Sequence, residues 1–178
     1  MLKGVVAKRY ARAVYEIALE QDSLDQWMDD LKSIQVFFQQ PEVAAYLSDV
    51  KLQFENKKTL ISRALQGLRP VALNLAYLLV SRGRIDVIGE VVTEYEKLVN
   101  QQRGIEVVEV KTAVPLDEEE KKRLSDRLAA ITGKKVILQI GVDPDIIGGL
   151  VAKIGDKVID GSTKAKLIAL KAKLAGAG

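Results

Sequence analysis

The sequence predicts an all-α six-helix bundle followed by a small α+β domain with the element order β-α-β-β-β-α. From residue 3 to residue 102, apolar residues recur at the spacing of three and four that is typical of amphipathic helices. After Gly104 the sequence changes to β-branched residues that partly alternate with charged ones, which is typical of strands. We therefore predict two domains, residues 1–104 and residues 105–178.

The composition excludes several classes of function. The 178-residue chain is 48% hydrophobic and 29% charged with a net charge of +3, which is ordinary for a globular protein and weak for a nucleic-acid binder. It contains no cysteine and no histidine, which excludes disulfides, zinc–thiolate sites and histidine-based acid–base catalysis. The longest apolar run, Val71 to Val80, is shorter than the roughly 20 residues that span a bilayer. We expect a protein that is soluble or that reaches a membrane only through a partner.

Residues that favour helix ends divide the first domain into six helices. Ser23 to Gln26 resemble a capping box, Pro41 and Pro70 suit a helix start because proline lacks an amide hydrogen, and Gly83 suits a helix end. The predicted helices cover residues 3–21, 24–38, 41–47, 51–65, 71–82 and 85–102. The short connections between them favour an antiparallel bundle.

The first and the fifth of these helices are more apolar than one buried face requires. The first carries a second edge of small residues, Ala7, Ala11 and Ala18, and the fifth is apolar on nearly every side. Such helices either lie at the centre of a bundle or present a surface to a partner. Burial inside the bundle is the simpler interpretation of both.

The second domain is predicted to contain four strands and two helices. The predicted strands cover residues 105–114, 136–142, 150–154 and 157–159, and the helices cover residues 117–131 and a final segment behind Ser162. Four acidic residues beginning at Asp117 complement the dipole of the first helix, and Gly133 ends it. A Gly-Asp pair at Gly155 joins two strands as a hairpin, and Asp160 or Ser162 can cap the final helix. We expect helices to cover one face of the sheet.

No motif in the chain predicts catalysis. Gly148 and Gly149 lack the other residues of a phosphate-binding loop, and they more simply allow a sharp turn into a strand. Four aspartates between residues 143 and 160 would bind a metal only if the fold brought them together, and their turn positions already account for them. Ser162, which precedes Thr163 and Lys164, fits helix capping better than serine–lysine catalysis. We therefore expect no catalytic residue, no cofactor and no metal, and a protein that is not an enzyme.

The final predicted helix is basic and amphipathic. Its lysines and large apolar residues are Lys164, Lys166, Leu167, Ile168, Leu170, Lys171, Lys173 and Leu174. Segments of this kind dock on acidic helices, on anionic lipid or on nucleic acid. One hypothesis is therefore a basic adaptor that binds RNA or an anionic membrane surface, and a solvated lysine face over packed leucines is the simpler alternative.

A set of short motifs follows one another along the chain. In the C-terminal half they are Thr112 to Leu116, Asp143-Pro144, Ile147 to Gly149, Gly155-Asp156 and Asp160 to Ser162. In the N-terminal half they are Arg9 to Ala11, Ala13 and Gly83-Arg84. The order of these motifs resembles that of the ATP synthase delta subunit family, whose mitochondrial relative is the oligomycin-sensitivity-conferring protein. The resemblance spans the entire chain, and its C-terminal part is the more specific.

The resemblance implies a non-catalytic subunit of the peripheral stalk, or stator, of a bacterial F-type ATP synthase. In this family the N-terminal bundle binds N-terminal segments of the α subunits on the catalytic head, in a groove between its first and fifth helices. The C-terminal domain binds b-type stalk subunits, and the resulting joint couples proton transport to ATP synthesis. The implied location is the cytoplasmic face of the bacterial plasma membrane, without a membrane span and without nucleic acid.

The resemblance also implies two sets of partner-binding residues. Candidates for the α-subunit site are Tyr10, Val14, Leu75, Leu78, Leu79 and Arg84. Candidates for the stalk site are Lys164, Lys166, Leu167, Leu170, Lys171 and Leu174. Because the fifth helix is apolar on nearly every side, its sequence does not indicate which of its leucines face outward.

Overall fold

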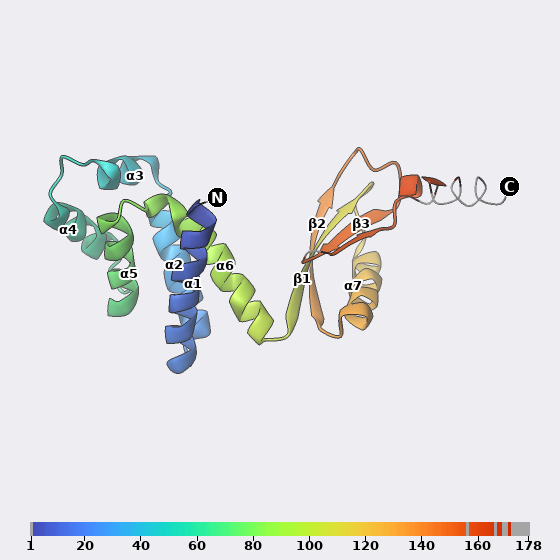
Figure 1. Ribbon diagram of the computed structural model, residues 1–178, viewed down its shortest axis with the longest axis horizontal. Helices are drawn as coiled ribbons and strands as arrows, with labels where there is room; N and C mark the ends of the chain where they lie inside the picture. Colours follow the sequence, from blue (N-terminus) through green and yellow to red (C-terminus); the bar gives the residue numbers. More distant parts are fainter. Residues whose placement is uncertain (1, 156, 166, 169–170, 172–178) are drawn as a thin grey trace. The chain divides into compact units, whose positions relative to one another are not determined.

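The computed structural model describes residues 2–155, 157–165, 167–168 and 171. Helices form the first part of the chain, and a small sheet with a helix on it follows in the second (Figure 1). The chain divides into two compact units, Met1–Val99 and Asn100–Gly178, and their boundary lies shortly before the predicted one at Gly104. The prediction of a helical N-terminal part followed by a small sheet domain is confirmed.

Residues 2–102 form helices joined by short turns and loops. Their bounds are α1 Leu2–Glu20, α2 Leu24–Phe38, α3 Pro41–Ser48, α4 Phe54–Ala64, α5 Pro70–Ser81, the 3-10 helix η1 Ile85–Val87 and α6 Ile88–Gln102. Pro41 and Pro70 each stand in a first turn, as predicted. The segment predicted as one helix from residue 85 begins instead with η1, so its first turn is tighter than an α-helical turn.

The predicted capping box at Ser23 is wrong. Ser23 makes no side-chain bond to the first turn of α2, because its hydroxyl donates to the Ala18 carbonyl of α1 at 3.5 Å instead. Its amide donates to the Ala18 carbonyl at 2.9 Å, and the amide of Asp22 donates to the Leu19 carbonyl at 3.3 Å. Asp22 has a positive φ of 48°, so these residues form a Schellman ending of α1. The Ser23 carbonyl accepts from the amide of Trp27 at 3.0 Å, so Ser23 joins the two helices through its backbone and not through a side-chain cap.

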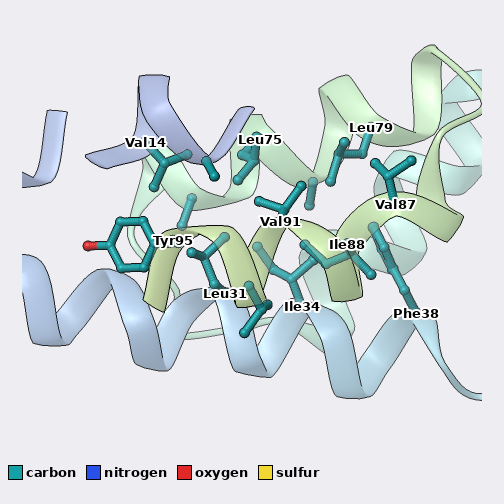
Figure 2. Close-up of a cluster of buried hydrophobic side chains, with 14 of the residues drawn as sticks. Val14, Leu31, Ile34, Phe38, Leu75, Leu79, Val87, Ile88, Val91 and Tyr95 are labelled. Atoms are coloured by element: carbon teal, nitrogen blue, oxygen red, sulfur yellow. The ribbon is translucent and has the colours of Figure 1, made fainter. Parts of the chain in front are cut away.

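The core of the first unit is a single apolar cluster. Figure 2 shows side chains from α1, α2, α5 and α6 meeting in it. Its largest fully buried members are Trp27, Leu31, Ile34, Ile61, Leu79, Val91 and Tyr95. Ala7, Ala11 and Ala18 are also completely buried, so the small-residue edge of α1 serves close packing inside the bundle.

The described residues of the second unit form a four-stranded sheet with the spatial order β2-β1-β3-β4. The bounds are β1 Ile105–Thr112, α7 Glu118–Thr132, β2 Lys135–Val142, β3 Leu150–Ile154 and β4 Lys157–Asp160. β1 pairs in parallel with β2, and α7 is the crossover that this pairing needs. β3 pairs antiparallel with both β1 and β4.

α7 covers one face of this sheet, as predicted. Val108, Val110 and Ala152 are buried on that face and pack with Leu128 of α7. Asp117 caps α7 in a full capping box with Glu120. Both residues belong to the four acids that were predicted to complement the helix dipole. At the other end Gly133 adopts the left-handed conformation and stops the helix.

Candidate partner-binding sites

The α-subunit candidates divide into buried and accessible residues. Val14, Leu75 and Leu79 are buried in the core cluster, where Figure 2 shows all three. Leu78 is 41% exposed, although it adjoins the fully buried Leu79. Tyr10 is half-buried and packs against the edge of the core. The first three therefore hold α1 and α5 in the bundle, and the last two contribute to its surface.

The exposed side of α5 forms a stripe at helical spacing. Val71 is 40% exposed, Leu78 is 41% exposed, and the exposed Asn74 lies between them. Because residues three and four apart share a face of a helix, these side chains line one outward face. The sequence analysis missed Val71, and the interruption of the apolar run by Asn74 is the signal that marks this face.

α1 presents an exposed face of its own. Along it lie Val5, Arg9, Arg12, Glu16 and Leu19, which follow one another at intervals of four and three residues. Val5 is 61% exposed, and Arg12 pairs with Glu16 at 3.1 Å. This face combines two apolar ends with a basic centre, so it can contact a segment that is itself amphipathic.

Arg84 closes α5 through its backbone. Its amide donates to the Leu79 carbonyl at 2.8 Å, and the amide of Gly83 donates to the Val80 carbonyl at 3.0 Å. Gly83 has a φ of 62°, so the two residues form a Schellman ending. The Arg84 side chain is exposed, which leaves it accessible to a partner while its backbone serves the helix end.

An ion pair joins the start of α1 to η1. The ammonium of Lys3 contacts the carboxylate of Asp86. This hydrogen bond and the charge of Asp86 raise the pKa of Lys3. The first turn of α1 is thereby held beside the segment that follows α5.

A partly buried cluster holds the start of α5 on α2. Arg69, directly before Pro70, donates from Nε to Asp30 at 2.7 Å, and its guanidinium lies over the ring of Trp27 at 4.7 Å. Both the stacking and the ion pair favour arginine at this position. Trp27 Nε1 and Arg69 Nη2 are buried without a hydrogen-bond partner, so the indole and guanidinium are held mainly by packing and charge. The sequence analysis missed this cluster.

The stalk candidates lie at the end of the described chain. Lys164, Leu167 and Lys171 are exposed, and Leu167 is 60% exposed. Ile168 beside them is exposed to a similar degree. The remaining candidates, Lys166, Leu170 and Leu174, lie outside the described residues. The described part of this segment thus presents both ammonium groups and large apolar side chains to solvent.

Local hydrogen bonds fix the beginning of the segment. Ser162 Oγ accepts from the amide of Ala165 at 3.2 Å, so Ser162 is the cap of the first turn. Asp160 accepts from the amide of Ser162 at 2.9 Å, and this bond holds the pKa of Asp160 below its ordinary value. Both candidates for the cap therefore take part in this turn, Ser162 directly and Asp160 by orienting Ser162.

Asp143 is fixed in a similar way at the start of the loop before β3. Its carboxylate accepts from Lys111 and from the amide of Asp145, both at 3.1 Å. The hydrogen bond from Lys111, followed by that from the Asp145 amide, lowers the pKa of Asp143. These partners account for Asp143 as a turn residue, as its position in the sequence predicted.

The described part of the chain has few features of other kinds of site. A shallow groove of about 400 Å³ lies between α2 and α4, with Lys32, Val36 and Leu65 among its lining residues. Within residues 2–155, 157–165, 167–168 and 171, no three potential metal ligands cluster together. The same residues include no helix whose length and apolarity suffice to cross a membrane.

Comparison with known proteins places the chain in a family. The protein-family model described as ATP synthase delta (OSCP) subunit matches residues 6–174 of this chain. A Dehalococcoides mccartyi protein called ATP synthase subunit delta is 39% identical over 166 residues, which cover 93% of this chain and 92% of that protein. A Geobacillus protein of the same name is 36% identical over 178 residues and covers 99% and 100% of the two chains. A chain of the Toxoplasma gondii mitochondrial ATP synthase hexamer, 20% identical, shares the fold with a TM-score of 0.68 over 98% of both chains. The chain therefore belongs to the ATP synthase delta (OSCP) subunit family.

Proposed function

We propose that this protein is the delta subunit of an F-type proton-translocating ATP synthase. The observation that carries the proposal is the match over nearly the whole chain to relatives that bear this name. In this role the subunit is non-catalytic. It belongs to the peripheral stalk, which links the catalytic head to the membrane sector and couples proton transport to ATP synthesis. Its place is peripheral, at the cytoplasmic face of the bacterial plasma membrane.

The two units take different partners in this proposal. The helices of residues 1–104, acting as one six-helix bundle, bind N-terminal segments of the α subunits. Residues 105–178 bind b-type stalk subunits through the exposed basic and apolar residues of the C-terminal segment. Two contacts on one chain raise the effective affinity of each, so a joint of this kind dissociates slowly without catalysis.

The α-subunit site centres on the outward stripe of α5. Leu78 and Val71 supply apolar contact area there, and Tyr10 supplies it on α1. Val14, Leu75 and Leu79 support this surface from below, because they pack between the helices that form it. Arg84 follows α5 in the chain, and its exposed side chain provides a cation for a carboxylate of the incoming segment. This arrangement suits an amphipathic helix that lays its apolar face on the stripe.

Calorimetric titration of the full chain with a peptide from the α-subunit N-terminus tests the proposal. Wild type is expected to bind at micromolar concentration, and Leu78→Glu is expected to weaken binding by about tenfold or more because a carboxylate replaces an apolar contact. Leu78 is 41% exposed, so the variant should keep the helical circular dichroism of wild type. Absence of binding by wild type would refute the α5 site.

Val36→Glu is the matched control. Val36 is an apolar residue of α2 that is even more exposed than Leu78 and lies outside the proposed site. The Val36→Glu substitution introduces the same charge at an exposed helical position, so the affinity of this variant for the peptide should equal that of wild type. A similar loss in both variants would indicate a general charge effect instead of a local contact.

A further inference from the structure

Two pieces of backbone in the second unit lie so close together that only glycine fits between them. A Cβ added to Gly149 would lie 2.4 Å from the carbonyl oxygen of Gly161 and 3.1 Å from the Cα of Ser162. Gly149 also has a φ of 84°, a conformation that residues with side chains disfavour. A Cβ added to Gly148 would lie 2.8 Å from Thr163 Oγ1. The loop before β3 and the chain after β4 are therefore in direct backbone contact.

Hydrogen bonds hold this contact, which we call the glycine clasp and define as Gly148, Gly149 and residues 161–163. The amide of Thr163 donates to the Gly148 carbonyl at 2.8 Å, and the amide of Gly161 donates to the Leu150 carbonyl at 2.9 Å. The carbonyl of Gly149 accepts from the amide of Ala113, just beyond β1, at 3.4 Å. The clasp thus joins the end of the hairpin to the central strand of the sheet.

The clasp lies where the C-terminal segment begins. Within the clasp, Ser162 caps the first turn of that segment by accepting from the amide of Ala165. Ser162 is buried, although every residue of the preceding strand β4 is exposed. A four-residue edge strand gives little support to the chain that follows it. The contacts with Gly148 and Gly149 supply the support that β4 does not.

We propose that the glycine clasp is a positioning device that sets the direction in which the C-terminal segment leaves the sheet. Through it, Lys164 and Leu167 are held in the orientation in which they meet the stalk. The proposal rests on the stalk contact proposed above and adds residues that act through the backbone without touching the partner. It also gives Gly148 and Gly149 a role beyond the turn into β3.

The test compares Gly149→Ala with Gly155→Ala in the full chain. Both glycines have a positive φ, 84° and 56°, so both substitutions strain the backbone. At Gly155, however, a Cβ would meet nothing within 4 Å, whereas at Gly149 it would push the clasp apart. Hydrogen exchange should show about tenfold or greater loss of protection at Gly161 and Thr163 in Gly149→Ala alone. Amides between β1 and β2 should keep their protection in both variants.

Binding to a soluble fragment of the b-type stalk subunit provides the functional measurement. Gly149→Ala should bind about tenfold or more weakly than Gly155→Ala, and both should bind the α-subunit peptide as wild type does. Equal stalk affinity of the two variants, with protection lost at Thr163, would overturn the positioning role. If wild type fails to bind the fragment, the stalk contact itself is refuted, which is a different result because it precedes any substitution.

A second variant covers the case in which Gly149→Ala unfolds the whole second unit. If Gly149→Ala loses protection throughout β1 and β2, Gly148→Ala takes its place. There the added Cβ meets only the side chain of Thr163, chiefly Oγ1, and no backbone, so the substitution is milder. A binding loss in Gly148→Ala that is relieved in the double variant Gly148→Ala with Thr163→Ala would support the clasp, because alanine lacks the Oγ1 atom that the added Cβ meets. No loss in Gly148→Ala with an opened clasp would overturn it.

Discussion

The hydroxyl of Tyr95 donates a hydrogen bond to the backbone carbonyl of Leu24 at 2.9 Å, between residues 71 positions apart in the sequence. Tyr95 is fully buried on α6, and its ring meets that of Tyr15 edge-on with 6.4 Å between centroids. A single side chain thereby ties α6 to the first residue of α2 and packs against α1. The contact thus links α6 to the two helices at the start of the chain.

Tyr95→Phe should lower the free energy of unfolding by about 1 kcal/mol, because the ring still fills its space while the hydrogen bond is lost. Urea denaturation followed by circular dichroism measures the change. Tyr46→Phe is the control, since Tyr46 lies on the surface of α3 and its substitution should change stability by less than about 0.5 kcal/mol. Equal effects of the two substitutions would contradict a special role for the Tyr95 hydroxyl.

Asp30→Ala should destabilise the first unit by about 2 kcal/mol, because it leaves the partly buried guanidinium of Arg69 without its carboxylate. Glu16→Ala removes the carboxylate of an exposed pair with Arg12 and should cost less than about 0.5 kcal/mol. Chemical denaturation compares the two. Trp27, the single tryptophan of the chain, reports locally on the cluster, so its fluorescence should change in Asp30→Ala and not in Glu16→Ala.

Asp117→Ala should destabilise α7 by about 1 kcal/mol, since it removes the side chain that accepts from the amide of Glu120 at 2.7 Å. Asp126→Ala, in the exposed middle of the same helix, removes the same charge without touching the cap. Hydrogen exchange along α7 distinguishes the two variants. Faster exchange in the first turn is expected in Asp117→Ala only, and its appearance in both would point to charge in place of capping.

Acid should destabilise two turns, the one at Asp143 that begins the loop before β3 and the one at Asp160 that ends β4. The pKa values of Asp143 and Asp160 are lowered in the folded chain by their hydrogen bonds. A carboxyl group whose pKa is lower when folded stabilises the fold above its unfolded pKa, and this contribution disappears as the pH falls through the folded value. Loss of hydrogen-exchange protection at Asp145 and Ser162 should therefore begin below about pH 4.

Asp143→Asn and Asp160→Asn provide the check on this pH dependence. Each asparagine still accepts a hydrogen bond from the backbone but does not titrate in this range. Protection at Asp145 should then become independent of pH in Asp143→Asn, and protection at Ser162 should do so in Asp160→Asn. A pH dependence that survives both substitutions would assign it to other carboxylates.

The helices could be predicted because residues at or next to a helix end determine where that helix begins or stops. Pro41, Pro70 and Gly133 act through their own backbone, so their positions sufficed. Ser23 failed as a capping residue because its amide and its hydroxyl both bond to the Ala18 carbonyl of the preceding helix, a contact that depends on how that helix ends. The parallel pairing of β1 with β2 also depends on two distant segments, and neither strand encodes it alone.

The candidate sites show the same limit more clearly. Leu78 and Leu79 are adjacent and chemically identical, yet one faces solvent and the other lies in the core. A helix that is apolar on nearly all sides carries no pattern that separates them. The sequence singled out Gly148 and Gly149, whereas their contact with Gly161 became apparent only from the fold.

The central place of β1 in the sheet has a mechanical consequence. The chain enters β1 soon after leaving α6, so tension transmitted along the backbone from the first unit reaches the sheet at this strand. β1 is paired with β2 over eight residue positions and with β3 over five. A pull along the strand axis loads these hydrogen bonds together in shear, instead of opening them one after another as in a peeled hairpin. The sheet therefore resists a pull along β1 with both ladders of hydrogen bonds at once.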